Sequence, residues 1–111
     1  MKKIKIDELD FSKVKNLIPV VVQNSITKEV LMVAYTNREA LRETIRTKQA
    51  HYWSRSRGKI WKKGETSGHT QKVKCILVDC DADTLLFIVE QVGPACHTGK
   101  KTCFYNELES F

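Results

Sequence analysis

Residues 71–92 decide the fold, and they read QKVKCILV-DCDAD-TLLFIVEQV. The two apolar runs, residues 71–78 and 84–92, are rich in branched and aromatic side chains, which predicts two strands. The acidic pentapeptide at residues 79–83 is expected to join them. If this pentapeptide is extended, alternate side chains point to opposite faces, so its three aspartates lie on one side and Cys80 on the other.

Three carboxylates this close together repel one another unless a cation or protons neutralise them. Asp79, Asp81 and Asp83 therefore allow three interpretations. An EF-hand calcium loop would place Glu90 at its twelfth position, but its sixth would be Thr84, where a glycine is needed. A solvated acidic turn is the second interpretation. The third is a magnesium site, in which carboxylates and waters surround the ion next to a substrate phosphate.

The whole chain of 111 residues is long enough for one compact domain, with residues 1–17 as a charged lead-in. A capping box formed by Thr36 and Glu39 predicts a helix over about residues 37–48. Its inward residues are expected to be Ala40, Leu41, Thr44 and Ile45. Further strands are predicted at residues 18–23, 30–35, 51–56, 60–61 and 102–105. This order of elements predicts an α+β fold with a largely antiparallel or mixed sheet and one main helix.

Charge and composition narrow the classes of partner. Nineteen basic and thirteen acidic residues give a net charge of +6, which favours an anionic partner such as nucleic acid or a phosphorylated metabolite. No apolar run is long enough to span a bilayer, and no signal peptide is evident, so we expect a cytoplasmic protein with no membrane partner. In that reducing compartment, four cysteines are expected to be metal ligands or free thiols.

The cysteines lack the paired spacing of zinc ribbons, but their surroundings favour a metal site. Cys80, Cys96 and Cys103 as three sulfur ligands with an open fourth position would describe a catalytic zinc. Adding Cys75 would instead close a structural site with four cysteines. Because Cys75 lies in the middle of a predicted strand, we expect it to be a small core residue.

A basic and aromatic segment precedes the acidic one. Arg55 and Arg57 are predicted to alternate onto one side of a strand, which suits bidentate capture of phosphate. Trp53 and Trp61 allow two interpretations, a stacking surface for single-stranded nucleic acid or pairing across neighbouring strands. His69, beside a glycine in a surface loop, is a candidate general acid or base.

Four motifs follow one another along the chain: YWSRSR at 52–57, WKKGETSGH at 61–69, DCDAD at 79–83, and QVGPACHTG at 91–99 with Cys103-Phe104. In this order they resemble the phosphoribosyl-AMP cyclohydrolase family of histidine biosynthesis, over about residues 20–105. The resemblance implies hydrolytic opening of the adenine ring of 1-(5-phosphoribosyl)-AMP between N1 and C6, giving the formimino aminoimidazole carboxamide ribonucleotide. Some family members carry a second, pyrophosphohydrolase domain, whereas residues 1–111 are expected to be a single cyclohydrolase domain.

The resemblance also implies an intertwined homodimer that uses two metals. Zinc would be shared across the interface by Cys80 of one subunit and Cys96 and Cys103 of the other. Magnesium would be held by Asp79, Asp81 and Asp83. Protons would be moved by His69 or His97. The expected substrate-binding residues are Arg55, Arg57, Lys62, Lys63, Thr66 and Ser67. The expected partner is therefore a small phosphorylated nucleotide and not nucleic acid, since the clustered aspartates would repel a polyanion.

Overall fold

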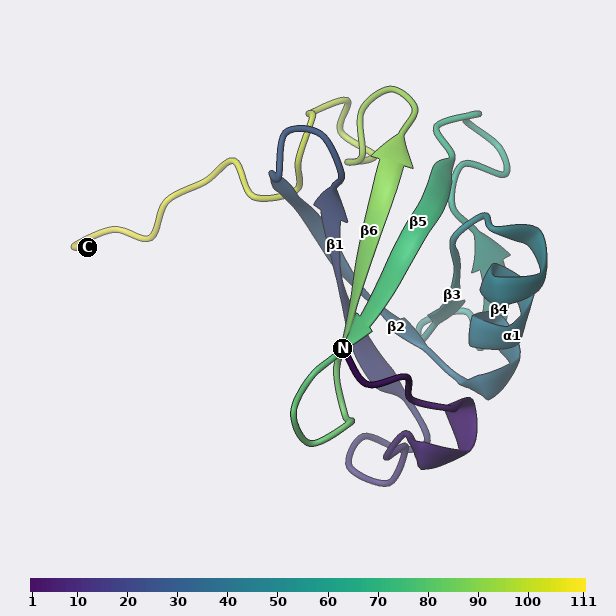
Figure 1. Ribbon diagram of the computed structural model, residues 1–111. Coiled ribbons are helices and arrows are strands. Elements are labelled where there is room, and N and C mark those ends of the chain that lie inside the picture. Colours follow the sequence, from purple (N-terminus) through teal and green to yellow (C-terminus); the bar gives the residue numbers. More distant parts are fainter.

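The computed structural model describes all of residues 1–111. Its elements are η1 (Ile6–Glu8), β1 (Ile18–Asn24), β2 (Val30–Thr36), α1 (Arg38–Thr47), β3 (His51–Ser54), β4 (Lys59–Lys62), β5 (Gln71–Val78) and β6 (Leu85–Gln91). Four strands form one sheet in the order β2-β1-β6-β5, and β3 and β4 form a separate hairpin (Figure 1). The prediction of an α+β fold with one main helix is confirmed.

The four-stranded sheet is mixed. Strands β1 and β2 pair antiparallel, as do β5 and β6, and the two hairpins meet through a parallel pairing of β1 with β6. Hairpins form locally because short turns join their strands, whereas the central parallel pair needs a long connection. In this chain the connection contains α1 and the β3–β4 hairpin, which brings both onto one face of the sheet (Figure 1).

The hydrophobic core lies between that face and the elements that cover it. Val20, Phe87 and Val89 point to this face and are fully buried, as alternation along a half-covered strand requires. Leu41 of α1 packs in the same cluster. Tyr52 of β3 stacks on Phe87 with ring centroids 5.8 Å apart. The core therefore fixes the β3–β4 hairpin to the centre of the sheet.

Replacing Phe87 with alanine is expected to lower the free energy of unfolding by about 3–5 kcal/mol, because a buried ring leaves a cavity. Denaturant unfolding at a fixed protein concentration measures this change. Phe104→Ala is the matched control, since Phe104 is 60% exposed and its removal should change stability by less than about 0.5 kcal/mol. Equal losses in the two variants would contradict this account of the core.

The opposite face of the sheet carries no helix or strand (Figure 1). Val21, Leu77 and Leu86 stand side by side on it, as the strand registers show. Val33 of β2 lies on the same face and is 48% exposed. An apolar sheet face is unusual in contact with water and is typical of an interface. We refer to these residues as the open sheet face.

Helix α1 agrees with its predicted range but begins differently. Thr36 is still paired with Ile18 in the sheet, so the cap falls to Asn37, whose side chain accepts a hydrogen bond of 2.8 Å from the Ala40 N–H. The predicted capping box is therefore wrong. Ile45 is also not inward, since it is 43% exposed. The other predicted inward residues are buried: Ala40, Leu41 and Thr44. No helix combines the length and apolar character needed to cross a membrane.

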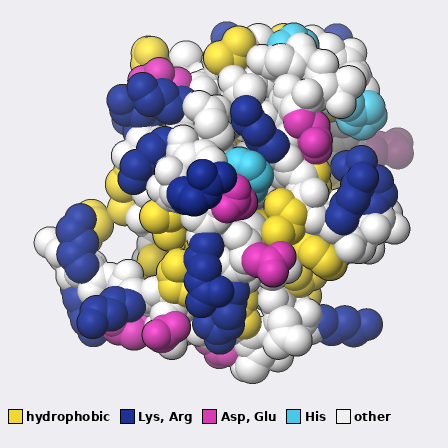
Figure 2. Space-filling view, turned by 90° about the vertical axis from the view of Figure 1, so that its right-hand side faces the viewer, with side chains coloured by type: hydrophobic (Ala, Val, Ile, Leu, Met, Phe, Trp, Pro, Cys, Tyr) yellow, Lys and Arg dark blue, Asp and Glu magenta, His cyan; other side chains and the backbone are white.

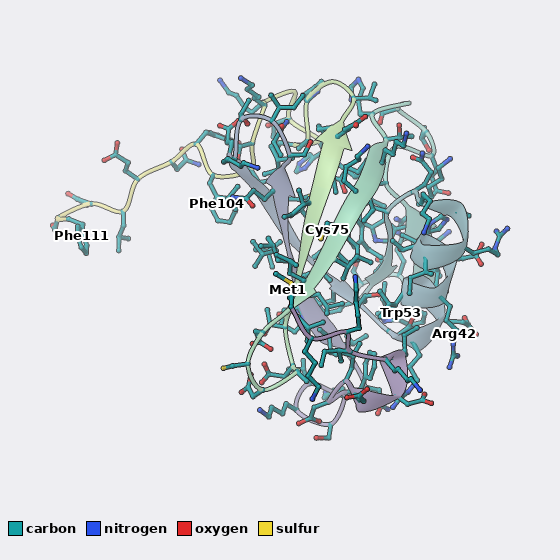
Figure 3. All side chains as sticks on the ribbon, viewed as in Figure 1. Met1, Arg42, Trp53, Cys75, Phe104 and Phe111 are labelled. Carbon is teal, nitrogen blue, oxygen red and sulfur yellow. The ribbon has the colours of Figure 1, made fainter.

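Two further predictions are wrong. Residues 102–105 form no strand, because their only hydrogen bond between two backbone groups is the one that the Cys103 N–H donates to the Leu31 carbonyl at 2.8 Å. The tail beyond it, with Phe104 and Phe111, extends away from the domain (Figure 3). Cys75 is exposed and not in the core. A bulge follows Val73 in β5, and Cys75 then faces the open side.

Candidate active site

A cleft of about 500 Å³ opens where the β3–β4 hairpin, the loop after β4 and the turn after β6 meet. The hairpin and the loop after it are consecutive in the sequence, and the packing of the hairpin against the sheet brings the distant turn after β6 next to them. Eight predicted site residues line the cleft: Arg57, Lys62, Lys63, Thr66, Ser67, His69, Cys96 and His97. The volume falls within the range of pockets that bind small molecules.

The wall of the cleft is basic. Arg57, Lys59, Lys62 and Lys63 line it, against the single acidic side chain of Glu65. Strand β4 ends at Lys62, so the basic side chains come from a rigid hairpin and the residues next to it. A cleft lined by one sign of charge concentrates ligands of the opposite sign. This arrangement suits a substrate that carries phosphate groups.

Lys63 reaches across the cleft floor to the turn after β6. Its Nζ donates a hydrogen bond of 2.6 Å to the carbonyl of Ala95, and it lies 5.9 Å from the ring centroid of Trp61. Partial burial lowers the pKa of Lys63, although the nearby thiols of Cys96 and Cys103 act in the opposite direction. The contact joins the β3–β4 hairpin to the segment that carries the cysteines.

Two cysteine thiols meet at this end of the molecule. Cys96 is only 7% exposed, and the Thr98 hydroxyl donates to its sulfur at 3.0 Å. This hydrogen bond lowers the pKa of Cys96, which favours the thiolate that a metal ligand needs. Burial raises the pKa of Cys103, and a hydrogen bond with Cys96 raises it further. The two sulfurs are soft donors suited to zinc.

Cys80 lies at the other end of the sheet, exposed in the loop between β5 and β6 (Figure 1). The seven residues of β6 separate this loop from the turn that carries Cys96. At a rise of about 3.3 Å per residue the strand spans about 23 Å. Zinc–sulfur bonds are about 2.3 Å long, so Cys80 cannot share a zinc with Cys96 of the same chain.

The acidic pentapeptide is a turn and not an extended segment. The Asp79 N–H donates to the Thr84 carbonyl at 3.1 Å, and Ala82 adopts a positive φ of 61°. The side chain of Asp79 accepts hydrogen bonds from the backbone N–H groups of Asp83 and Thr84. The alternation argument is therefore wrong, yet the turn itself gathers the carboxylates. One oxygen each from Asp79, Asp81 and Asp83 lies within 4.8 Å of the others, an oxygen donor set that fits magnesium.

A lysine from the lead-in reaches this carboxylate cluster. Lys13 Nζ lies 2.7 Å from Asp83 Oδ2 and 3.3 Å from Asp81 Oδ2. The hydrogen bond from Lys13 lowers the pKa of Asp83 to about 2, while hydrogen bonding with Asp83 raises the pKa of Asp81. The cluster thus has one neutralising cation inside the chain. No local pattern could have shown this pairing, because Lys13 lies about seventy residues before its partners in the sequence.

Arg55 lies outside the cleft. Strand β3 ends at Ser54, so Arg55 and Arg57 belong to a turn and do not share a strand face as predicted. The guanidinium of Arg55 instead lies 4.0 Å from the ring centroid of Tyr35. Trp61 pairs across the hairpin with Tyr52, with ring centroids 5.3 Å apart, which confirms the cross-strand interpretation for that tryptophan.

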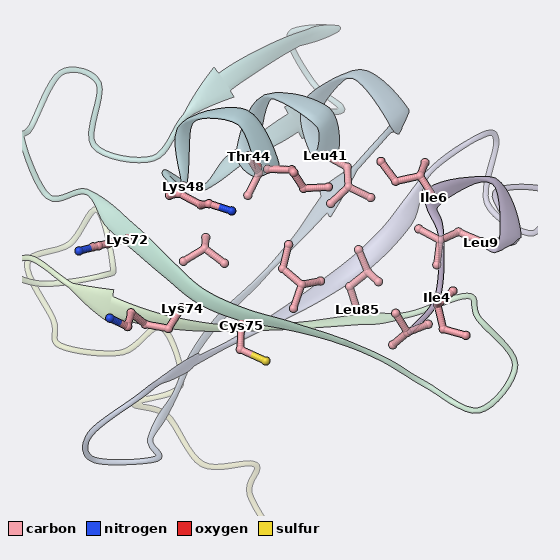
Figure 4. A pocket seen from close by; sticks show the side chains of 14 residues that line it. Ile4, Ile6, Leu9, Leu41, Thr44, Lys48, Lys72, Lys74, Cys75 and Leu85 are labelled. Carbon is pink, nitrogen blue, oxygen red and sulfur yellow. The ribbon is translucent and has the colours of Figure 1, made fainter. Parts of the chain in front are cut away.

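A second cleft, of about 480 Å³, lies between α1, β5 and the N-terminal segment (Figure 4). Its lining is mainly hydrophobic and contains no histidine, aspartate or glutamate. Lys48, Lys72 and Lys74 line it as well, and Lys and Arg side chains are spread over this side of the molecule (Figure 2). This lining therefore lacks the imidazole and carboxylate groups that line the first cleft.

Comparison with known proteins assigns the family. Residues 32–105 match the family model described as phosphoribosyl-AMP cyclohydrolase. The chain belongs to the phosphoribosyl-AMP cyclohydrolase family. The residues matched by the cyclohydrolase model include those of the cleft, the cysteines and the carboxylate cluster, and they exclude Lys13.

Curated relatives that are described as phosphoribosyl-AMP cyclohydrolases align with nearly the whole chain. The phosphoribosyl-AMP cyclohydrolase of Cenarchaeum symbiosum is 57% identical over 104 residues, which is 94% of this chain and 96% of its own. That of Archaeoglobus fulgidus is 61% identical over 102 residues, 92% of this chain and 94% of its own. That of Clostridium botulinum is 56% identical over 101 residues, covering 91% and 92%. These relatives confirm the family that the sequence motifs indicated.

Proposed function

We propose that this protein hydrolyses 1-(5-phosphoribosyl)-AMP, opening the adenine ring between N1 and C6 to give the formimino aminoimidazole carboxamide ribonucleotide of histidine biosynthesis. The observation that carries the proposal is that His69, His97 and Cys96 line the same cleft as Arg57 and Lys62. Family membership supplies the reaction, and the cleft supplies groups of the right chemistry to perform it.

Ring opening adds water to C6 and breaks the C6–N1 bond, with a proton leaving the water and another reaching N1. His69 and His97 both line the cleft, and imidazole is the side chain that most often serves as a general acid or base. We assign one of them to receive the proton of the water and to deliver a proton to N1. Cys96 and Cys103 would hold zinc beside them, and bound zinc lowers the pKa of water toward neutrality.

The two phosphate ends of the substrate require positive charge. Arg57, Lys62 and Lys63 supply it from one wall of the cleft, and Thr66 and Ser67 offer hydroxyl groups from the neighbouring loop. Magnesium at the carboxylate cluster would bind phosphate oxygen, as this ion does in many nucleotide sites. The carboxylate cluster and the cleft lie at opposite ends of one chain, so both can serve one substrate only if a second chain contributes.

A homodimer would bring together the two pairs of groups that one chain keeps apart, namely Cys80 with Cys96 and the carboxylate cluster with the cleft. A two-fold axis can lie between two open sheet faces, parallel to the sheets and perpendicular to the strands. Such an axis packs the two faces together and reverses the strand direction of the partner. The loop that carries Cys80 would then approach the partner's cleft. The open sheet face has the apolar character such an interface needs, with Val33 and its neighbours otherwise in water. We therefore propose two identical composite sites, each with Cys80 and the carboxylate cluster from one chain and Cys96 and Cys103 from the other.

An absorbance assay tests the proposed reaction. Purified protein loaded with zinc and supplied with magnesium is expected to change the ultraviolet spectrum of 1-(5-phosphoribosyl)-AMP as the purine ring opens. A strong zinc chelator should abolish the change, and added zinc should restore it. A spectrum that stays constant with the fully metal-loaded protein would overturn the proposed function.

Asp81→Asn tests the magnesium assignment. The variant is expected to need about tenfold more magnesium for half-maximal activity while keeping its zinc content, because one carboxylate charge is lost from an oxygen-ligand site. Magnesium titrations of activity and metal analysis measure the two effects. Glu90→Gln is the matched control, since Glu90 forms only a surface ion pair with Lys74. An unchanged magnesium titration in Asp81→Asn would place this metal elsewhere.

A further inference from the structure

Three buried or half-buried side chains with amide or hydroxyl groups form a chain of hydrogen bonds that runs from the core toward the cleft. The hydroxyl of Tyr52 donates to Gln71 Oε1 at 2.5 Å, and Gln71 Nε2 donates to Gln91 Oε1 at 2.8 Å. Tyr52 and Gln71 are fully buried, and Gln71 and Gln91 are directly paired across β5 and β6. Buried polar groups with every partner satisfied hold a single arrangement. The side chain of Gln91 is therefore anchored from the core side.

The far end of Gln91 holds the backbone of His69. Its Nε2 donates to the His69 carbonyl at 3.3 Å and to the Val92 carbonyl at 3.1 Å. The His69 N–H donates in turn to Ser67 Oγ at 3.2 Å. These hydrogen bonds hold the loop after β4 against the end of β6. The loop residue that they hold is His69, which lines the cleft.

The imidazole of His69 lies directly against Gly93. A Cβ added at Gly93 would stand 2.7 Å from His69 Cδ2, closer than real Cβ atoms approach, and 3.0 Å from its Nε2. Gly93 also has a positive φ of 68°. Any side chain at this position would push the ring out of place. His97, by contrast, is exposed in its turn.

We propose that Gln91 and Gly93 are positioning residues for His69 in the ring-opening reaction, with Gln91 anchored by the buried Tyr52–Gln71 pair. The inference rests on the proposed function and assigns the proton transfer to His69, the histidine whose backbone and ring are both fixed by neighbours. A group that transfers a proton must be held within a fraction of an ångström of its target. Gln91 and Gly93 touch neither substrate nor metal and act through His69.

Two variants test this role with matched controls. Gln91→Glu keeps the acceptor for Gln71 but cannot donate to the His69 carbonyl, and Gly93→Ala displaces the ring. Each is expected to lower kcat about ten- to hundredfold with KM changed less than about threefold, since geometry and not binding is altered. The controls are Asn106→Asp, the same amide-to-carboxylate change in the exposed C-terminal tail, and Gly58→Ala, at φ 63° with no atom within 4 Å of the added carbon. Both controls should keep wild-type kcat.

A double-mutant cycle decides whether the effect passes through His69. In a His69→Ala background, Gln91→Glu and Gly93→Ala should cause no further loss of kcat. Further losses as large as those in the wild-type background would overturn the inference, as would wild-type turnover by His69→Ala itself. Either result leaves the proposed function standing, provided that the unmodified protein opens the ring.

The placement of His69 can also be observed without substrate. In NMR spectra, the imidazole signals of His69 are expected to shift in Gln91→Glu and Gly93→Ala and to stay unchanged in the two controls. If the unmodified protein failed to open the ring, the proposed function would fall, while shifted His69 signals would still support the positioning contacts. Unshifted signals in both test variants would overturn them.

Discussion

Cys96→Ser is expected to lose zinc binding and to lower kcat/KM on the order of a thousandfold or more, because water without the metal stays a poor nucleophile at neutral pH. The Cys96 sulfur is almost fully buried and receives the Thr98 hydroxyl at 3.0 Å, an environment that favours the thiolate. Serine keeps the size of the side chain but is a far weaker zinc ligand. Zinc content by elemental analysis and the ring-opening assay measure the two losses together.

Cys75→Ser is the matched control for this experiment. Cys75 is exposed, and its sulfur is directed away from α1 (Figure 4). The substitution should leave both zinc content and kcat/KM at wild-type levels. A zinc-free Cys96→Ser protein with full activity would show that the metal does not take part in the reaction. Loss of zinc in Cys75→Ser as well would favour a structural site with four cysteines.

Mixing two inactive variants is expected to restore activity. Cys80→Ser and Cys96→Ser should each be inactive alone, since every composite site then lacks one sulfur ligand. In a mixed dimer, one site combines both substitutions and the other combines none. If an equal mixture is unfolded and refolded together, half of the dimers are mixed and half of their sites are intact, so about a quarter of wild-type activity should return.

The physical reason for this recovery is the length of β6. Seven residues of extended chain keep Cys80 away from Cys96 in the same subunit, so the proposed zinc site, which uses both cysteines, needs two chains. Mixing Cys96→Ser with Cys103→Ser is the control, because both substitutions fall in the same half of each site and every site in the mixture stays defective. An equally inactive mixture of Cys80→Ser and Cys96→Ser would contradict the shared site.

Local pattern predicted the elements that carry the site, and it failed where side chains from distant segments compete. The strands around the acidic turn follow from runs of apolar residues, and α1 follows from its amphipathic spacing. The capping box failed because pairing with β1 keeps Thr36 in the sheet. Cys75 was misplaced because a bulge in β5 cannot be read from residue type. Arg55 was misplaced because the end of β3 turns it toward Tyr35.

By itself, the sequence determined the fold class, the family and the kinds of group available for catalysis, because periodicity and motif spacing are properties of neighbouring residues. Only the tertiary structure decided which of these groups meet. It placed His69 and Cys96 in one cleft and brought Lys13 to the carboxylate cluster. It also placed Cys80 at the end of the sheet opposite to Cys96. These outcomes depend on how hairpins pack across a common core, and that packing is set by contacts between residues far apart in the chain.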